Sequence, residues 1–315
     1  MSILQQIKTG LSSAKSNKRR RLSLEKQEAR AALLFVLPFF IGFIIFGLAP
    51  FFYALYISFM DFNSFKSLDS LEWTGLSNYK AILHDSVAVS SYFKSFYYTI
   101  LYVPLLTIAG FLAAVLLNKS FYWKTFSRSL FLMPYVANIV AISIVFTMLF
   151  DPFGGLVNTL LTNLGVDQPP LWFAGTKTAI LTTALVAVWA NFPFQMIVYL
   201  AALQGVPRDL YEAADIDGAT KWQQLSRITL PLVSPTTFFL VITATIGSFQ
   251  NFTIFNALTR GGPGIASRVA SLNMYEEAFS LNHYSYSAAQ AIVLFVIILL
   301  ISAIQWGGQK KWVHY

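Results

Sequence analysis

The chain has 315 residues, of which 56% are hydrophobic and only 11% are charged. A soluble domain of this size is about a quarter charged, so the composition excludes an ordinary soluble protein and predicts a membrane protein. The net charge of +8 does not indicate nucleic-acid binding, because the bases are few and the apolar runs are long. The absence of cysteine excludes disulfides and thiolate metal sites.

Six runs of the sequence carry no charged side chain, and each can cross a hydrocarbon core about 30 Å thick, which takes about 20 helical residues. In chain order these runs are Ala31–Met60, Ser95–Asn118, Ser129–Phe150, Thr178–Val206, Ile228–Thr259 and 278–309. Lipid cannot hydrogen-bond to backbone groups, so single apolar segments cross it as helices. The sequence therefore predicts an all-α polytopic membrane protein with six transmembrane helices.

Lysine and arginine are unevenly distributed between alternate loops. Sixteen of the 22 lie in the N-terminal arm, in the loops 119–128 and 208–227 and in the tail, whereas six lie in the other loops. The positive-inside rule therefore predicts that both termini are cytoplasmic. The predicted organisation is a basic cytoplasmic arm (1–30), a six-span transmembrane domain (31–306) and a cytoplasmic tail (307–315).

A charged, glycine-broken segment, Pro207–Pro231, separates the fourth and fifth apolar runs. Pro207 suits the first position of a helix, and Gly218 suits the left-handed residue that ends one. Thr220 and Gln223 have the spacing of a capping box, which predicts that a second helix begins there. The segment therefore reads as a cytoplasmic loop made of a helix, a glycine break and a capped helix.

One face of the first loop helix combines small and polar side chains. Leu210, Ala213, Ala214 and Asp217 share this face at the spacing i, i+3, i+4 and i+7. The small alanines would let another surface approach closely. From the residues alone, a docking surface and an amphipathic connector lying on the bilayer stay equally open.

The residue string itself resembles the signature loop of the membrane subunits of bacterial ABC importers. That signature is Glu-Ala-Ala, three residues, Gly, nine residues, Ile, one residue and Leu-Pro. Every position is matched, by Glu212-Ala213-Ala214, Gly218, Ile228 and Leu230-Pro231. The six-span layout matches too, so the resemblance covers nearly the whole chain.

Other motifs resemble the carbohydrate-uptake branch of that family, which includes the maltose, multiple-sugar and glycerol-phosphate permeases. They are the Asp-Gly-Ala at 217–219, the "TGLSNY" of Thr74–Tyr79 and the "TRGGP" of Thr259–Pro263. The chain departs from the maltose-type subunit because it lacks extra N-terminal spans and a large external domain. The resemblance implies a permease subunit of an ATP-driven importer in the bacterial cytoplasmic membrane.

The resemblance also implies partners and coupling residues. Expected partners are a second permease subunit, either a paralogue or an identical copy, two cytoplasmic ATPase subunits and an external solute-binding protein that delivers a carbohydrate. In that family the signature loop docks in a cleft of the ATPase and passes its motion to the spans. The implied coupling residues are Glu212, Ala213, Ala214, Asp217 and Gly218.

The motifs of an enzyme are missing from the sequence. No G-x-x-x-x-G-K-[S/T] phosphate loop occurs, so ATP and Mg²⁺ are expected on the partner ATPase and no cofactor on this chain. His84, His283 and His314 are scattered, and no H-E-x-x-H motif exists. We therefore expect no catalytic residue and no metal site.

The spans hold candidate residues for a solute path. Without intramembrane charges an ion or proton relay is disfavoured, whereas a neutral, hydroxyl-rich solute needs amides, hydroxyls and aromatic faces. The candidates are Tyr135, Asn138, Trp189, Asn191, Phe194, Gln195, Ser248, Gln250 and Asn251. The family resemblance favours Asn191, Phe194 and Ser248 among them. Hydrogen bonding between helices is the alternative role for each polar side chain.

Two alternatives to carbohydrate import stay open at this stage. One is an ABC importer for another small solute, such as glycerol phosphate. The other is a channel or facilitator that works without ATP, which co-purification with an ATPase would exclude.

Overall fold

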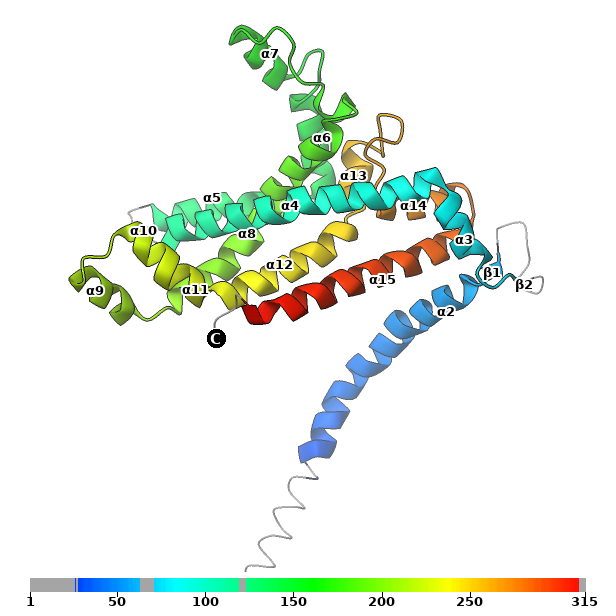
Figure 1. Cartoon of the computed structure of the whole chain (residues 1–315), viewed down its shortest axis with the longest axis horizontal. Helices are drawn as coiled ribbons and strands as arrows, with labels where there is room; N and C mark the ends of the chain where they lie inside the picture. The colour runs from blue at the N-terminus through cyan, green and yellow to red at the C-terminus, as the bar shows by residue number, and fades with distance from the viewer. Residues whose placement is uncertain (1–25, 27, 63–70, 119–122, 312–315) are drawn as a thin grey trace, which may run out of the picture. The chain divides into compact units, whose positions relative to one another are not determined.

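The computed structural model describes residues 26, 28–62, 71–118 and 123–311 (Figure 1). Most of the predicted basic arm and the last four residues of the predicted tail lie outside these ranges. The described part is mostly helical, and its strands are a two-residue antiparallel pairing of β1 (Met60–Asp61) with β2 (Glu72–Trp73). The predicted all-α class is therefore confirmed. The chain divides into two units, residues 1–56 and residues 57–315.

The first unit consists of one long apolar helix in its described part. The helix runs from Glu28 to Ile57 and includes a π-helical turn, η1 (Ile44–Leu48), followed by α2 (Ala49–Ile57). None of its most apolar stretch is buried. A helix that is apolar all round has to be covered by lipid or protein, so this helix fits the first predicted span.

The second unit holds the remaining helices. In chain order they are α3 (Ser77–His84), α4 (Ser86–Asn118), α5 (Lys124–Val136), α6 (Ile139–Leu149), α7 (Leu156–Asn163), η3 (Trp172–Ala174), α8 (Ala179–Gln204), α9 (Arg208–Ile216), α10 (Lys221–Gln224), η4 (Leu225–Thr229), α11 (Leu230–Leu232), α12 (Ser234–Phe249), α13 (Thr253–Leu258), α14 (Ala270–Tyr275), η5 (Glu276–Ser280), α15 (Tyr284–Gly308) and η6 (Gln309–Lys311). The loop helices α9 and α10 lie at one end of this unit and α3 lies at the other (Figure 1).

The third and fifth predicted spans are each bent rather than straight. The chain turns by 95° between α5 and α6 and by 65° between the helix Lys221–Leu232 and α12. In the third span, Pro134 lacks a backbone N–H, and Asn138 starts a new helix by accepting a hydrogen bond from the N–H of Val140 at 2.8 Å. In the described residues four helices are long and apolar enough to cross alone, and the number rises to six if each bent pair is one span.

The second predicted span begins earlier than the charge-free run indicated. Helix α4 starts at Ser86, because Asp85 caps it by accepting hydrogen bonds from the N–H groups of Val87 and Ala88. Lys94 lies inside this helix and donates to the carbonyl of Ile265. The helix therefore continues beyond the apolar run, which the counting of charges could not reveal.

The core of the second unit is the long contact between α4 and α8. Small side chains on both helices, including Ala114 and Ala187, are fully buried there. The closest approach is at Gly110, where an added Cβ would lie 2.6 Å from the Cβ of Gln195. Small residues let membrane helices pack closely, because packing rather than the hydrophobic effect holds them together. This contact fixes the position of Gln195, which lines the cavity described next.

Candidate functional site

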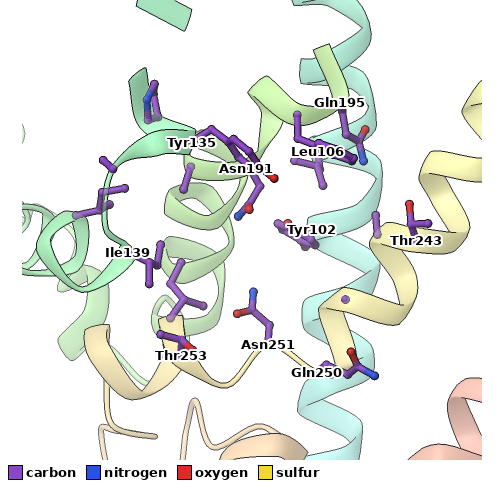
Figure 2. Close-up of a pocket in the computed structure, with 18 residues that line it drawn as sticks. Tyr102, Leu106, Tyr135, Ile139, Asn191, Gln195, Thr243, Gln250, Asn251 and Thr253 are labelled. Carbon is purple, nitrogen blue, oxygen red and sulfur yellow. The ribbon is translucent and has the colours of Figure 1, made fainter. Parts of the chain in front are cut away.

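A cavity of about 480 Å³ lies within the second unit, among α4, α8, the α5–α6 break and the junction of α12 with α13. Figure 2 shows the 18 residues that line it. They come from α4, the α5–α6 break, α8, the end of α12 and the start of α13. Irregular backbone at membrane depth is tolerated where it lines a cavity, so the breaks and the cavity belong together.

The cavity wall is polar but uncharged. Asn191, Gln195, Gln250 and Asn251 supply carboxamides, and hydroxyl groups come from tyrosines and threonines. None of the described residues that line it is Asp, Glu, Lys, Arg or His. Asn191 and Asn251 reach into the same central space of Figure 2, with Tyr102 beside them. Such a wall can exchange hydrogen bonds with a neutral solute but offers no counter-ion to a charged one.

One polar atom in the wall is buried without a hydrogen-bond partner. The side chain of Gln195 is only 2% exposed. The Oε1 of Gln195 has no hydrogen-bond partner within the described part of the chain. Buried polar groups are nearly always hydrogen-bonded, so this oxygen is suited to a solute or water in the cavity.

The other amides are already oriented by the protein. The Nδ2 of Asn191 donates to the carbonyl of Ala187 at 2.8 Å, and that of Asn251 donates to the hydroxyl of Tyr98 at 2.9 Å. Each bond holds its side chain in place and leaves the carbonyl oxygen as an acceptor. The rings of Tyr135 and Phe194 stack with centroids 5.9 Å apart and add an apolar face to the wall.

Six of the nine predicted path residues line the cavity, and three do not. Those in the wall are Tyr135, Asn191, Phe194, Gln195, Gln250 and Asn251. Ser248 instead faces α4, where its hydroxyl lies 2.7 Å from the Oγ1 of Thr99. The ring of Trp189 packs on Phe146, and Asn138 caps α6.

Sequence reasoning overlooked three polar residues of the wall. They are Tyr102 on α4, Thr243 on α12 and Thr253 on α13. Tyr102 carried a usable signal, because tyrosine in membrane helices is enriched near the interfaces and Tyr102 lies in the middle of an apolar run. The threonines carried none, since threonine commonly bonds to its own helix, as Thr243 does to the carbonyl of Phe239.

The predicted coupling loop (residues 207–231) has the expected local structure. Gly218 follows α9 with φ +75°, and the N–H groups of Gly218 and Ala219 donate to the carbonyls of Asp215 and Ala214. This is a Schellman motif, which satisfies the free carbonyls at a helix end. Both bonds of the capping box between Thr220 and Gln223 are present. Pro207 differs slightly from expectation, because it precedes the first helical residue.

The predicted coupling residues lie on the surface of the second unit. Glu212, Ala213, Asp217 and Gly218 are exposed and Ala214 is half-buried. The apolar side chains of Ile216 and Trp222 are 87% and 73% exposed beside them. The loop thus presents a mixed small, apolar and acidic surface. Among the described residues no group of three or more His, Asp or Glu side chains could hold a metal ion.

Comparison with known proteins identifies the family. Residues 106–306 match the family described as the binding-protein-dependent transport system inner membrane component. The chain belongs to this family. The resemblance to ABC importer permeases is therefore confirmed, and the chain is an inner membrane component of a transport system that depends on a binding protein.

Relatives of this inner membrane component align along most of its length. The sn-glycerol-3-phosphate transport system permease protein UgpA of Agrobacterium fabrum (strain C58) is 32% identical over 287 residues, 90% of this chain and 95% of that protein. The probable starch degradation products transport system permease protein AmyD of Thermoanaerobacterium thermosulfurigenes is 29% identical over 274 residues, 86% of this chain and 91% of that protein.

A solved structure shares the fold of this inner membrane component. It is a chain of a bacterial ABC transporter involved in the import of the acidic polysaccharide alginate. The TM-score is 0.79 with 22% sequence identity, and the alignment covers 92% of this chain and 99% of that one. The fold of this chain is thus one that is also found in a solved transporter structure.

Proposed function

We propose that this chain is a permease subunit of an ATP-driven importer for a neutral carbohydrate. The observation that carries the substrate class is the cavity wall, which combines four carboxamides, tyrosine and threonine hydroxyls and a stacked aromatic face. Sugars present many hydroxyl groups and an apolar C–H face, and this wall can meet both. The unpartnered Oε1 of Gln195 would gain a hydrogen bond when a sugar binds.

A neutral substrate fits the cavity better than an anionic one. Proteins bind phosphates and carboxylates with arginine or lysine, and the described wall contains neither. The relatives include a permease for sn-glycerol 3-phosphate, so that solute remains the second candidate. If it were the substrate, the second permease subunit would have to supply the positive charge.

The proposed assembly has the partners that the sequence indicated. A second permease, two ATPase subunits and an external solute-binding protein would complete the importer, with ATP and Mg²⁺ held by the ATPase. The exposed surface of Glu212, Ala213, Ala214, Asp217 and Gly218 would dock on the ATPase. The chain itself would hydrolyse no ATP. Its place would be the bacterial cytoplasmic membrane.

Uptake by the purified complex tests this function. The chain is co-expressed with its neighbouring transport proteins, and the complex is reconstituted in vesicles. We expect it to retain an ATPase subunit and to take up a neutral oligosaccharide that binds the cognate external protein. ATP-dependent uptake of sn-glycerol 3-phosphate or alginate fragments alone would overturn the substrate class. Uptake that needs no ATPase would overturn the importer.

Topology provides a separate prediction. We expect six spans with both termini in the cytoplasm, and the domain limits 1–30, 31–306 and 307–315. A reporter fused after Tyr315 or placed in the loop 207–231 should be cytoplasmic, and one in 151–177 should be external. The reason is the excess of lysine and arginine in the first set of loops. A cytoplasmic signal from 151–177 would contradict the six-span arrangement.

A further inference from the structure

Two side-chain ties join α9 to the helix that follows it in the coupling loop. In the first tie, the hydroxyl of Tyr211 and the Oγ1 of Thr229 lie 2.9 Å apart. In the second, the carboxylate of Asp215 accepts hydrogen bonds from the Nζ of Lys221 at 2.9 Å and from the Nε2 of Gln224. The loop is thus a braced hairpin of helices rather than a flexible connector.

The buried members of these ties matter more than the exposed ion pair. The side chains of Lys221 and Asp215 are 81% and 54% exposed, and an exposed ion pair contributes little to stability. Gln224 and Thr229 are only 4% and 5% exposed, although they belong to a loop. Losing the partner on α9 would leave each with longer hydrogen bonds only, from Nε2 of Gln224 to the carbonyl of Ala219 at 3.4 Å and from Oγ1 of Thr229 to the carbonyl of Gln224 at 3.3 Å, and weakening a buried hydrogen bond is costly.

The tied face of α9 is distinct from its exposed face. Tyr211 and Asp215 are four residues apart, so they point the same way, toward the following helix. Ala213 and Ile216 point away from that helix and are exposed. A partner that binds the exposed face would leave both ties intact.

Side-chain packing against the spans does not fix the position of α9. A cavity of about 470 Å³ separates Tyr211, Gln224 and Thr229 from Leu203 at the end of α8 and from the end of α4. The position of α9 relative to the spans therefore depends on the hydrogen bonds rather than on a filled core.

Thr229 connects this brace to the solute cavity. It ends the π-helical turn η4, and the chain bends by 65° a few residues later to begin α12. The cavity is lined by Thr243 and Gly247 of α12 and by Gln250, which follows the end of α12. The structural connection from α9 to the cavity wall thus consists of the two ties, the bend after Leu232 and α12.

We propose that the ties Tyr211–Thr229 and Asp215–Gln224 form a strut that transmits displacement of α9 to α12 and so controls access to the cavity. These four are positioning residues, which act through α12 and touch neither nucleotide nor solute. This role rests on the proposed function, since the ATPase would displace α9. Without the strut, α9 would move into the neighbouring cavity and α12 would not move with it.

The test uses the absence of cysteine from the chain. A single reporter, Thr243→Cys, is placed in the cavity wall of the full complex in vesicles, and its labelling by a maleimide is followed on this chain alone. With an unaltered loop, ATP and vanadate should change the labelling rate. In Tyr211→Phe combined with Thr229→Val, the ATPase should remain bound and active, but the labelling rates with and without nucleotide should become equal.

Matched variants separate the strut from simple loop stability. Thr229→Ser keeps the hydroxyl and should keep the nucleotide response, whereas Thr229→Val alone should weaken it. Ser226→Ala removes a hydroxyl from the same helix outside the strut and should have no effect. A full response in the double variant would overturn the strut. So would loss of ATPase binding in that variant, because the tied residues would then serve docking rather than transmission.

Failure of the proposed function would look different from failure of the strut. If no ATPase co-purifies with the unaltered chain, the importer itself is wrong. If the ATPase binds and labelling in the chain with an unaltered loop responds to nucleotide, the importer is supported. The labelling of the variants then shows whether the strut transmits the movement.

Discussion

Replacing Gly218 by valine is expected to abolish uptake while leaving the protein at its normal level in the membrane. Gly218 has φ +75°, and a Cβ added there would meet no atom within 4 Å. The penalty is therefore backbone strain and not a clash, about 1–2 kcal/mol for an ordinary residue and more for a β-branched one. That is too little to unfold the spans, but it is enough to shift the end of α9 on which the proposed docking surface lies.

Two substitutions calibrate this effect. Gly218→Asn should retain most uptake, because asparagine also occupies the left-handed position of a Schellman motif. Gly165→Val creates the same strain at φ +89°, after α7, again with no atom near the added Cβ. It should leave uptake unchanged, since α7 lies outside the coupling loop. Equal losses from Gly165→Val and Gly218→Val would contradict a specific role for Gly218.

Glu212→Lys probes the same surface by charge. Glu212 is exposed on α9, so the change should not disturb folding. We expect lost uptake together with weakened or unregulated ATP hydrolysis. Uptake and ATPase rate are measured together in vesicles, with and without the loaded binding protein. If both Glu212→Lys and Gly218→Val transport normally and the binding protein still stimulates ATP hydrolysis, the loop only connects two spans and has no coupling role.

Truncating the cavity wall should impair uptake without affecting assembly. Asn191→Ala removes a carbonyl oxygen that the bond to Ala187 holds in position, and Phe194→Ala removes one of the two stacked rings. A lost hydrogen bond in a buried site costs about 1–3 kcal/mol, so we expect roughly a tenfold or greater fall in uptake efficiency from Asn191→Ala. The measurement is the concentration dependence of uptake of the identified oligosaccharide.

Matched residues outside the cavity serve as controls for these two variants. Asn163→Ala changes an exposed asparagine of α7, and Phe239→Ala changes a half-exposed phenylalanine of α12. Both should transport normally. Unchanged kinetics in Asn191→Ala and Phe194→Ala, with the complex assembled, would remove these residues from the solute path.

The sequence alone determined the local structures of this protein. Long charge-free runs dictate helices, because lipid leaves no other way to satisfy the backbone. The capped break of the coupling loop was equally predictable, since Gly218, Thr220 and Gln223 act within a few residues of one another. The polar, uncharged character of the spans also predicted a neutral solute, because composition fixes which chemical groups a wall can offer.

Only the tertiary structure decided which of these polar groups share a cavity. Successive residues of a helix point about 100° apart, so Gly247 lines the wall while its neighbour Ser248 bonds to Thr99 on α4. Tyr102 belongs to the wall because α4 packs closely on α8 at Gly110, a contact between residues far apart in the chain. The strut is also tertiary, because Tyr211 meets Thr229 only after the break at Gly218 has folded one helix back on the other. Spacing along a sequence specifies faces and caps, whereas packing between segments selects the faces that meet.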